Sequence, residues 1–334
     1  RDFRARLVQQ GLAEGSRPSS VEDGGWAYQT DLLEQGSLLL SVPGDYWSLR
    51  RQYFGKVVML VLEHGDEFTM GVVLNRPTGL VAANISGLME TDFAGQIQKE
   101  ILKFAGFSGT STEVGEDWKV WFGGDCEGWE QLASGETPRH FCLHTLEHLE
   151  SSSRRIIKGV FVTSFAQARA HVEKGEASKE DFMLIVGYTG WSGGQLQSEL
   201  DRGGAWILGA ADQGLVLGQP PDAQVSLTRR LELACAKRMP DGSPSASAET
   251  EVGDGIHHWN QLYHALRPAE SLDDDEEAHN DDMIRRWVQV YLLSGSPGTA
   301  QRSTAVETES LAPGTVLRGS ATKWLLGRPG GTWP

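Results

Sequence analysis

The sequence predicts a globular fold that mixes β-strands with α-helices, and two patterns indicate it. Two runs rich in Val and Leu, KVVMLVLEH and TMGVVLNRP, are separated by GDEF, as in a β-hairpin. Residues 158 to 188 have a β-α-β pattern, in which KGVFVTSF and DFMLIVGY predict strands and FAQARAHVEKG predicts a helix. A chain of 334 residues with 39% apolar content can bury a substantial core.

The first part of the chain divides into an arm and the start of a core. Residues 1 to 35 are polar and irregular and predict an N-terminal arm, which Trp26 and Leu32 hold down. The core starts at Gly36, where GSLLLSVP predicts a short strand that Pro43 ends. Both hairpin strands are too apolar for a sheet with one face in water, so we expect both faces to be covered.

The next segments alternate between strands and less regular chain. Asn75, Arg76 and Pro77 are expected to end the second hairpin strand, because proline cannot donate to a ladder. Residues 81 to 104 have helical spacing, and FSGTSTEVGED predicts a loop. WKVWFGG then predicts a strand, and FCLHT is expected to return beside it.

The last third contains two departures from a regular pattern. After the strand AWILGA, residues 213 to 255 are interpreted as an inserted loop, and IHHWNQLYHAL resumes as a helix that closes a core of residues 36 to 267. Residues 268 to 334 form a C-terminal extension that opens with SLDDDEEAHNDD. This acidic linker is expected to stay exposed or to meet basic groups of a partner, whereas MIRRWVQVYLL has apolar surface that needs a cover.

Composition excludes several classes of protein. The net charge of -15, the pI near 5.1 and the lack of a basic cluster argue against nucleic acid as a partner. No apolar run approaches the roughly 20 residues of a membrane-spanning helix. The sparse cysteines Cys126, Cys142 and Cys235 argue against a secreted disulfide scaffold. The chain opens on Arg1 rather than Met, which is compatible with removal of a targeting peptide.

The stretch GYTGWSGGQLQSEL contains G-x-S-x-G, the pattern of a serine hydrolase's nucleophile elbow, with Ser192 as the candidate nucleophile. It follows the apolar run FMLIVG, and His257, His258 and His264 lie downstream, where a base is needed. However, no oxyanion loop of the HGGG type precedes it. Close packing of a glycine-rich turn explains the same letters, and this second explanation is favoured.

Three other patterns suggest chemistry more weakly. His140, His144 and His148 have the four-residue spacing of a helical metal site, but HFCLHT predicts a strand, so no metal is expected. Cys126 and Cys142 flank a predicted turn and are a candidate redox pair, although no C-x-x-C lowers a thiol pKa. The cluster GWSGG lacks the Lys and Ser/Thr of a phosphate loop.

Several segments in order are similar to one protein family. GSLLLSVP, KVVMLVLEHGDEFTMGVVLNRPTGL, VWFGGDCEG, FCLHT and GYTGWSGGQLQSELDRGGAWILGAAD resemble motifs of the AlgH family (YqgE-like proteins) across residues 36 to 212. IHHWNQLYHAL resembles the closing helix of that family. The family is bacterial, and members also occur in plastids of algae and plants, so the chain resembles a plastid-type member.

The resemblance implies an α+β fold, with a bifurcated, partly barrel-like sheet surrounded by helices and with terminal arms added to it. It implies no accepted catalytic activity and no cofactor. The fixed letters of the glycine-rich motif are Gly187, Tyr188, Trp191, Gly194, Gln195 and Leu196. Serine is not called for at the place of Ser192, so the resemblance makes the G-x-S-x-G pattern an accident of a turn.

The leading hypothesis is a non-enzymatic binding or auxiliary factor of a plastid that docks on a larger protein complex. Its expected location is the chloroplast stroma or the stromal face of the thylakoid, and its expected partner is a photosystem, in assembly, repair or regulation. The candidate anchors in the arms are Trp26, Trp287, Trp324 and Leu325.

The core offers a second candidate surface, and further classes of function stay open. The candidate ligand or docking residues are Asn75, Arg76, Gly123, Gly124, Tyr188, Trp191 and Gln195. Arginine beside a Gly-Gly turn can hold an anion, so a small-ligand or anion sensor is one such class. Two enzymatic functions also stay open: a serine hydrolase that uses Ser192 and a thiol redox protein that uses Cys126 and Cys142.

Overall fold

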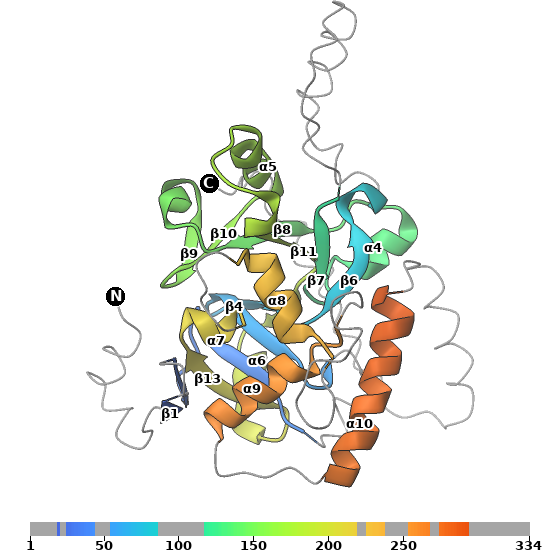
Figure 1. The fold of residues 1–334 in the computed structure, drawn as a ribbon. Helices are drawn as coiled ribbons and strands as arrows, with labels where there is room; N and C mark the ends of the chain where they lie inside the picture. The colour runs from blue at the N-terminus through green and yellow to red at the C-terminus, as the bar shows by residue number, and fades with distance from the viewer. Residues whose placement is uncertain are drawn as a thin grey trace, which may run out of the picture.

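The computed structural model has two β-sheets with helices packed around them, which makes the chain an α+β protein (Figure 1). The structure describes residues 25–43, 54–85, 117–218, 225–237, 253–267 and 274–293, together with the backbone of residues 19–20. The resemblance predicted one bifurcated sheet. The two sheets are distinct in their strand order, and a hydrogen bond from Val73 N to Gly123 O (2.9 Å) joins them.

The first sheet has seven strands, and each neighbouring pair is antiparallel. In order across the sheet, the strands are β1 (Ser19–Ser20), β2 (Trp26–Gln29), β13 (Trp206–Ala211), β3 (Leu38–Ser41), β4 (Val58–His64), β5 (Phe68–Val73) and β12 (Thr189–Ser192). The pairing of β4 with β5 confirms the predicted hairpin.

The second sheet has six strands and is mixed. In order, they are β6 (Pro77–Val81), β7 (Lys119–Phe122), β11 (Phe182–Val186), β8 (His140–His144), β10 (Val160–Thr163) and β9 (Arg154–Ile157). The segment FCLHT was expected beside WKVWFGG, and this is wrong, because β11 lies between β7 and β8 and pairs with both. Strand order depends on long-range packing, which the local pattern does not contain.

The predicted β-α-β unit is present with one strand inserted. Both β10 and β11 run antiparallel to β8, so they are parallel to each other. Helix α5 (Phe165–Glu173) connects them, and it begins where the Ser164 hydroxyl accepts a hydrogen bond from Gln167 N at 3.2 Å. This N-cap satisfies a backbone donor that the first turn of a helix otherwise leaves unpaired.

The remaining helices lie around the two sheets. They are α4 (Trp129–Ser134), α6 (Gln195–Arg202), α7 (Gln213–Val216), α8 (Leu227–Cys235), α9 (Ile256–Leu266) and α10 (Asp274–Trp287), with the short 3₁₀ helices η2 (Ala82–Asn84), η3 (Glu147–Ser152) and η4 (Lys179–Asp181). Helix α10 continues into the π-helical segment η5 (Val288–Leu293). None of the helices in the described part of the chain is long and apolar enough to cross a membrane.

Two predicted boundaries need correction. Residues 1–35 do not form one arm, because β2 pairs with β13 inside the sheet from Trp26 onward. Residues 213–255 are not one inserted loop, because they contain α7 and α8. Leu215 and Leu231 on these helices are buried in the core. The polar residues that flank the two short helices made the whole range resemble a loop. Residues 1–18, 86–116, 219–224 and 238–252 lie outside the described residues.

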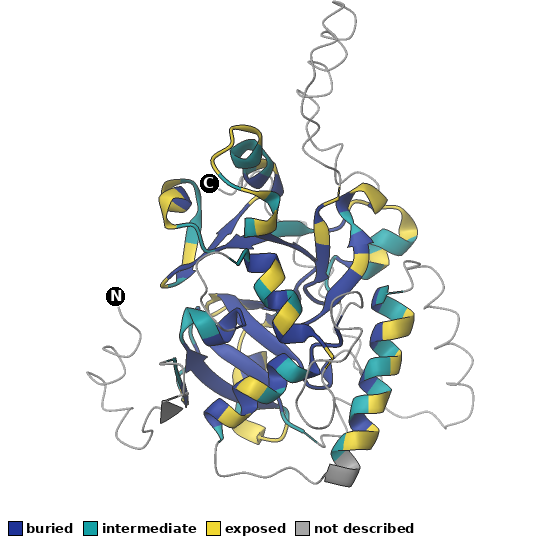
Figure 2. Cartoon of the chain, viewed as in Figure 1, coloured by how far each residue is buried: buried dark blue, intermediate teal, exposed yellow. Residues whose placement is uncertain are grey.

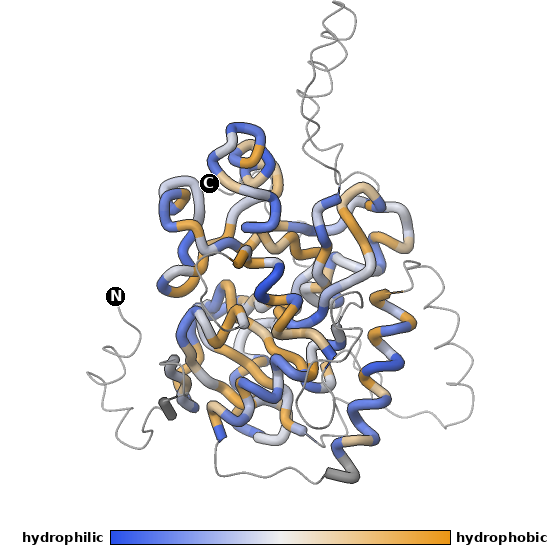
Figure 3. Tube along the Cα trace, viewed as in Figure 1, coloured by the Kyte–Doolittle hydropathy of each residue, from blue (hydrophilic) through white to orange (hydrophobic). Residues whose placement is uncertain are grey.

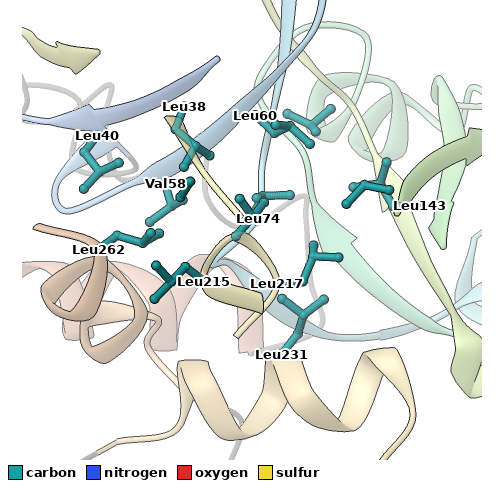
Figure 4. Packing of buried hydrophobic residues seen from close by; sticks show 14 of the residues in the cluster. Leu38, Leu40, Val58, Leu60, Leu74, Leu143, Leu215, Leu217, Leu231 and Leu262 are labelled. Atoms are coloured by element: carbon teal, nitrogen blue, oxygen red, sulfur yellow. The ribbon is translucent and has the colours of Figure 1, made fainter. Parts of the chain in front are cut away.

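Both faces of the hairpin are buried, as its composition predicted. Leu60 points into one hydrophobic cluster and Met59 into another, on the opposite side of the sheet. The first cluster fills the space between the sheets and helices α7, α8 and α9, where Leu38, Val58 and Leu74 approach Leu215, Leu231 and Leu262 (Figure 4).

Helix α10 covers part of the second cluster. Ile284, Val288 and Leu292 recur every four residues, and all three are buried there. Figure 1 shows α10 at one side of the molecule, Figure 2 shows its exposed outer stripe, and Figure 3 shows hydrophilic and hydrophobic residues alternating along it. The acidic run was predicted to be a solvated linker, but from Asp274 onward it is helical, with Asp282 exposed and Asn280 buried. Acidic residues begin the helix and Arg285 and Arg286 end it, which complements the helix dipole.

Candidate functional site

Asn75 and Arg76 lie where the chain leaves β5 and enters the second sheet. The strand ends at Val73 and β6 begins at Pro77 on a sheet edge, which confirms the predicted break. The Asn75 side chain accepts a hydrogen bond from Val58 N (2.9 Å) and donates to the carbonyl oxygens of Lys56 (2.9 Å) and Gly255 (2.8 Å). Asn75 therefore ties the crossing to β4 and to the start of α9.

The Arg76 guanidinium is enclosed by backbone carbonyl groups. Its Nη1 donates to Asn75 O at 3.0 Å and Asp254 O at 3.1 Å, and its Nη2 donates to Lys56 O at 3.3 Å and to Gly55 O. Burial lowers the pKa of Arg76 to about 10, and the nearby Asp254 opposes that change. Arg76 was a candidate for holding an anion from solution. The structure contradicts this, because the side chain is fully buried and turned to the protein's own carbonyls.

Gly123 and Gly124 sit where the end of β7 passes residues 187–189. A Cβ on Gly123 would lie 2.3 Å from Gly187 O, and one on Gly124 would lie 2.3 Å from Tyr188 O. No side chain fits at that distance, so these glycines permit two backbones to cross. Their role in the structure is close packing.

Tyr188 and Trp191 are buried, so the docking surface predicted around them does not form. Burial raises the pKa of the Tyr188 hydroxyl. The indoles of Trp191 and Trp206 donate to the same Glu199 oxygen, Oε2, at 3.2 and 2.8 Å. Gln195 is exposed and donates to Glu199 Oε1 at 3.0 Å. The cluster fixes α6 against the first sheet.

Ser192 is the last residue of β12, an edge strand, and Gly193 and Gly194 separate it from α6. Its Oγ lies 3.1 Å from Gln195 Oε1. The apolar run FMLIV belongs to β11 in the other sheet, so it does not lead directly into this turn. The strand β12 does lead into α6 through this turn. However, β12 is antiparallel to its sheet neighbour β5, whereas the elbow of an α/β-hydrolase follows a strand of a mostly parallel sheet.

Cys126 and Cys142 lie in different clusters, and all three cysteines are free thiols. Burial raises the pKa of Cys126 to about 11, with the Asp125 carboxylate as a second cause, and burial also raises the pKa of Cys142. Both shifts disfavour the thiolate that redox exchange requires. The structure therefore does not assemble these two cysteines into the predicted pair.

His140 and His144 lie on β8, whereas His148 lies on η3, so the three do not share a helix face. His144 is buried, its Nε2 lies 2.8 Å from Ser153 Oγ, and desolvation lowers its pKa to about 4. Within the described ranges, no group of three His, Cys, Asp or Glu side chains could hold a metal ion.

A Ser, His, Glu chain that the sequence did not reveal lies nearby. Ser152 Oγ is 3.0 Å from His171 Nε2, and His171 Nδ1 is 2.6 Å from Glu176 Oε2. This bond to His171 lowers the pKa of Glu176. The Ser152 hydroxyl donates its single proton to Leu149 O at 3.0 Å. A serine that donates its proton to a backbone carbonyl does not donate it to the imidazole, as a nucleophile must donate to its general base.

The predicted anchors have different positions. Trp26 stacks on Tyr28 with ring centroids 5.5 Å apart. Trp287 stacks on Tyr291 at 5.6 Å and meets Phe122 edge-on at 6.0 Å. Trp287 was expected to grip a partner. These ring contacts lie within this chain, so that expectation needs correction. Trp324 and Leu325 lie outside the described residues.

The most unusual group of charges surrounds Lys56, which sequence reasoning did not select. Its Nζ lies 2.5 Å from Glu277 Oε2 and 2.7 Å from Asp281 Oδ1, both on α10. The Lys56 side chain is only 5% exposed, and Nζ lies 5.2 Å from the centre of the Trp259 ring. The acidic run thus meets a basic group of its own core. It was expected to remain exposed or to meet a partner, and this is wrong for Glu277 and Asp281.

Asp254 connects this group to Arg76. Its carbonyl accepts from Arg76, one side-chain oxygen accepts from Ile256 N at 2.9 Å, and the other accepts from Arg285 Nε at 3.1 Å. Arg285 also lies 3.6 Å from Asp281. Two buried cations and the charges of α10 therefore meet at the start of α9.

An aromatic contact holds the other end of the helix. Trp129 Nε1 donates to Tyr291 O at 3.3 Å, and Trp129 meets Phe122 edge-on at 5.4 Å. Gly79 allows η5 to approach β6, because a Cβ there would lie 2.7 Å from Leu293 O. The signals for this region were the four-residue spacing of Glu277 and Asp281 and the apolar stripe after them. No feature of the sequence around Lys56 indicated that it would be buried or paired.

The fold has one antiparallel and one mixed sheet, and the chain passes between them at the buried Arg76 and the close-packed Gly123 and Gly124. These features define the class of α+β protein to which the chain belongs. The sequence profile of the AlgH-like family (DUF179) matches residues 45–231. The chain belongs to the AlgH-like family.

Individual relatives agree with this assignment. A UPF0301 protein from Nitrobacter hamburgensis is 32% identical over 219 residues, which cover 65% of this chain and 88% of the relative. A UPF0301 protein from Thiobacillus denitrificans is 30% identical over 178 residues, which cover 53% of this chain and 80% of the relative.

Solved structures are more distant. The AlgH protein from Pseudomonas aeruginosa has 22% identity and a TM-score of 0.37, with 56% of this chain and 82% of that chain covered. A protein from Corynebacterium diphtheriae has 13% identity and a TM-score of 0.34, with 55% and 78% covered. The matched profile ends at residue 231, so α9, α10 and η5 lie beyond it.

Proposed function

We propose that this chain is a non-enzymatic binding factor that docks on a larger protein complex in a plastid, with a thylakoid photosystem as the expected partner. The observation that carries the proposal is the α10–η5 extension, which lies beyond the matched family segment and packs on the family core. It adds a helix with an outward face to a core in which the predicted residues Arg76, Tyr188 and Trp191 are buried.

The outward face of α10–η5 mixes charge with apolar surface. Asp282 and Arg286 are exposed, and Val290 is 53% exposed, the highest value among the exposed large hydrophobic residues of the described part. Transient protein interfaces have this mixed composition, with an apolar centre and a polar rim. The net charge of -15 suits a protein partner better than a phosphate backbone.

The plastid part of the proposal is supported by the resemblance to plastid members of the family. Cell fractionation with an antibody against the native protein tests it. We expect the protein in the stroma or on washed thylakoids, and its recovery elsewhere would contradict this part of the proposal alone.

The docking part is tested by gentle isolation of the native protein and identification of what migrates with it on a native gel. We expect a stable complex much larger than the chain's 36.5 kDa. Migration with a photosystem supports the expected partner. Migration with another complex keeps docking but replaces the partner, and migration at the mass of the chain alone contradicts docking.

Point variants locate the contact. Val290→Asp on η5 should reduce the share of protein that migrates with the complex, because a charge then faces the apolar centre of the interface. Leu233→Asp is the matched control, since Leu233 is also an exposed large hydrophobic residue, at 38%, but lies on α8. Equal loss in both variants would place the contact elsewhere.

An enzymatic function has its own test. A fluorophosphonate probe reacts with activated serines, and we expect no labelling of the folded protein. Labelling that Ser192→Ala removes would establish the elbow, and labelling that Ser152→Ala removes would establish the Ser152, His171, Glu176 chain. Either result would contradict the non-enzymatic part of the proposal.

A further inference from the structure

The core surface beneath α10–η5 has a composition that specifies what can cover it. We call it the α10 contact surface and define it by Lys56, Gly79, Phe122, Trp129 and Asp254. Lys56 and Asp254 contact charged residues of α10, Phe122 and Trp129 contact the aromatic end, and Gly79 provides the close approach of β6 to η5.

Lys56 makes this surface selective for carboxylates. An ammonium group with 5% side-chain exposure has lost most of its water, and desolvation without a partner costs several kcal/mol. Glu277 and Asp281 supply the compensating charge from successive turns of one helix. A neutral or basic helix in the same place would leave the Lys56 charge uncompensated.

The contacts of Phe122 and Trp129 with the C-terminal end of α10–η5 add a second requirement for a helix that binds here. The Trp287 ring meets Phe122 edge-on and stacks on Tyr291, and the Trp129 indole donates to the backbone carbonyl of Tyr291. Ten residues separate Glu277 from Trp287, which on a helix is about 15 Å. The surface therefore contacts two carboxylates on one helical face and one aromatic ring about 15 Å further along, with a backbone carbonyl beyond it.

The cover is separable from the surface in two ways. Lys56, Gly79, Phe122 and Trp129 lie within residues 45–231, the matched family segment, whereas α10 lies beyond it. A helix also satisfies its own backbone hydrogen bonds, so α10 can leave without breaking a sheet ladder. The contacts that would be lost are mainly between side chains.

We propose that the α10 contact surface is a docking site for an acidic, aromatic helix of a partner protein, and that α10–η5 occupies this site until such a helix displaces it. The inference rests on the proposed function and adds a second contact to the one on the outward face of α10–η5, because it names the chemistry of a partner helix that binds the core beneath. Because α10 belongs to the same chain as the surface, its binding there is intramolecular, and a free helix competes poorly with it. Docking then requires a partner that binds more tightly or engages a second surface.

A labelled peptide of residues 274–293 is the probe, and its binding to full-length variants is measured by fluorescence anisotropy. Ile284→Asp with Val288→Asp opens the site, because it places charges on the buried face of α10. We expect the opened protein to bind the peptide at least tenfold more tightly than the wild type. Weak binding to both proteins would overturn the inference.

Charge reversal tests the chemistry. Lys56→Glu in the opened protein should weaken peptide binding at least tenfold, and a peptide with Glu277→Lys and Asp281→Lys should restore it. Lys119→Glu is the control, since Lys119 pairs with Glu232 and its side chain is 58% exposed. An equal effect of Lys119→Glu, or no effect of Lys56→Glu, would overturn the proposed recognition.

A second measurement applies if the opened protein does not fold. A protease site placed within residues 268–273 allows α10 to be cut from the folded wild type, after which labelled peptide is added in excess. We expect the peptide to replace the cut segment, and failure to exchange under native conditions would overturn displacement. The native-gel experiment is independent, so docking can hold while this inference fails, and the two failures are distinguishable.

Discussion

Arg76 and Lys56 are two buried cations that meet at the start of α9, and the protein neutralises them in different ways. The planar Arg76 guanidinium donates to four backbone carbonyls, of Gly55, Lys56, Asn75 and Asp254. The compact Lys56 ammonium is paired with two carboxylates of α10. Arg76 therefore depends on the fold of the core, whereas Lys56 depends on an element added to that core.

This contrast indicates which part of the molecule can change without unfolding. The carbonyls around Arg76 belong to segments that also build the sheets and start α9, so they cannot move away separately. The carboxylates near Lys56 belong to one helix whose backbone bonds are internal. A buried charge can thus mark either a permanent contact or a reversible one, depending on what supplies its partners.

The largest expected effect follows from removing Arg76. Arg76→Met leaves carbonyl groups buried without their donor, and we expect a loss of about 3 to 5 kcal/mol in unfolding free energy, or failure to fold. Urea unfolding followed by circular dichroism measures it. The control Arg202→Met, at an exposed arginine of α6, should change stability by less than about 1 kcal/mol. Equal losses would mean that the hydrogen bonds from Arg76 to the four carbonyls do not contribute measurably to the unfolding free energy.

Acid should weaken the core body through two buried histidines. Desolvation lowers the pKa of His144 and of His258 to about 4, below the value of 6.5 for an unfolded chain. Between pH 4 and pH 6.5 the unfolded chain binds more protons than the folded chain. The contribution of each neutral histidine to the unfolding free energy is therefore complete above pH 6.5 and is lost as the pH falls toward 4. The loss is about 3 kcal/mol for each histidine.

The slope of unfolding free energy with pH tests this, rather than its absolute value. His258→Asn should flatten the slope between pH 6.5 and 4, and His144→Asn should flatten it independently, because the two side chains lie in different parts of the fold. An unchanged slope in either variant would show that the corresponding imidazole is not kept neutral by burial.

Removing Lys56 should have a smaller and more local effect. Lys56→Met removes the cation next to Glu277 and leaves Asp281 with Arg285 alone, and since both carboxylates are partly exposed we expect a loss of about 1 to 3 kcal/mol. Replacing the carboxylates as well, with Glu277→Gln and Asp281→Asn, should recover part of it. A double-mutant cycle in urea gives the coupling energy. A coupling below about 0.5 kcal/mol would contradict the role given to these pairs.

The smallest effect is expected at an exposed pair. Lys119 and Glu232 form a contact whose lysine side chain is 58% exposed, and Lys119→Met should change stability by less than about 1 kcal/mol. This variant calibrates the Lys56 measurement, because it removes the same charge from a hydrated position. A loss as large as that of Lys56→Met would mean that burial does not distinguish the two lysines.

Local patterns predicted much of the fold. The apolar runs predicted the β4 and β5 hairpin with both faces buried, and the asparagine, arginine and proline at its end predicted where the chain leaves the sheet. The position of β8 between β10 and β11 was not predictable, because strand order follows from long-range packing. The polar stretches around α7 and α8 likewise concealed two core helices.

The site was harder to predict than the fold. Arg76 beside a turn suggested an anion site, but only the folded chain shows that four carbonyls enclose it. The acidic run suggested a solvated linker, since charged stretches usually face water. In the structure part of this run forms ion pairs, because Lys56, distant in the sequence, is buried opposite Glu277 and Asp281. Sequence alone contains no record of such a pairing.

Native-state hydrogen exchange on the wild-type protein tests most directly whether α10 is a reversible element on a fixed core. We predict that amides of α10 exchange through a local opening at least about 2 kcal/mol cheaper than the opening that exposes β4, and that added salt lowers it further. If α10 and β4 exchange with the same free energy, at low and at high salt, the helix leaves only when the core unfolds, which contradicts a reversible α10.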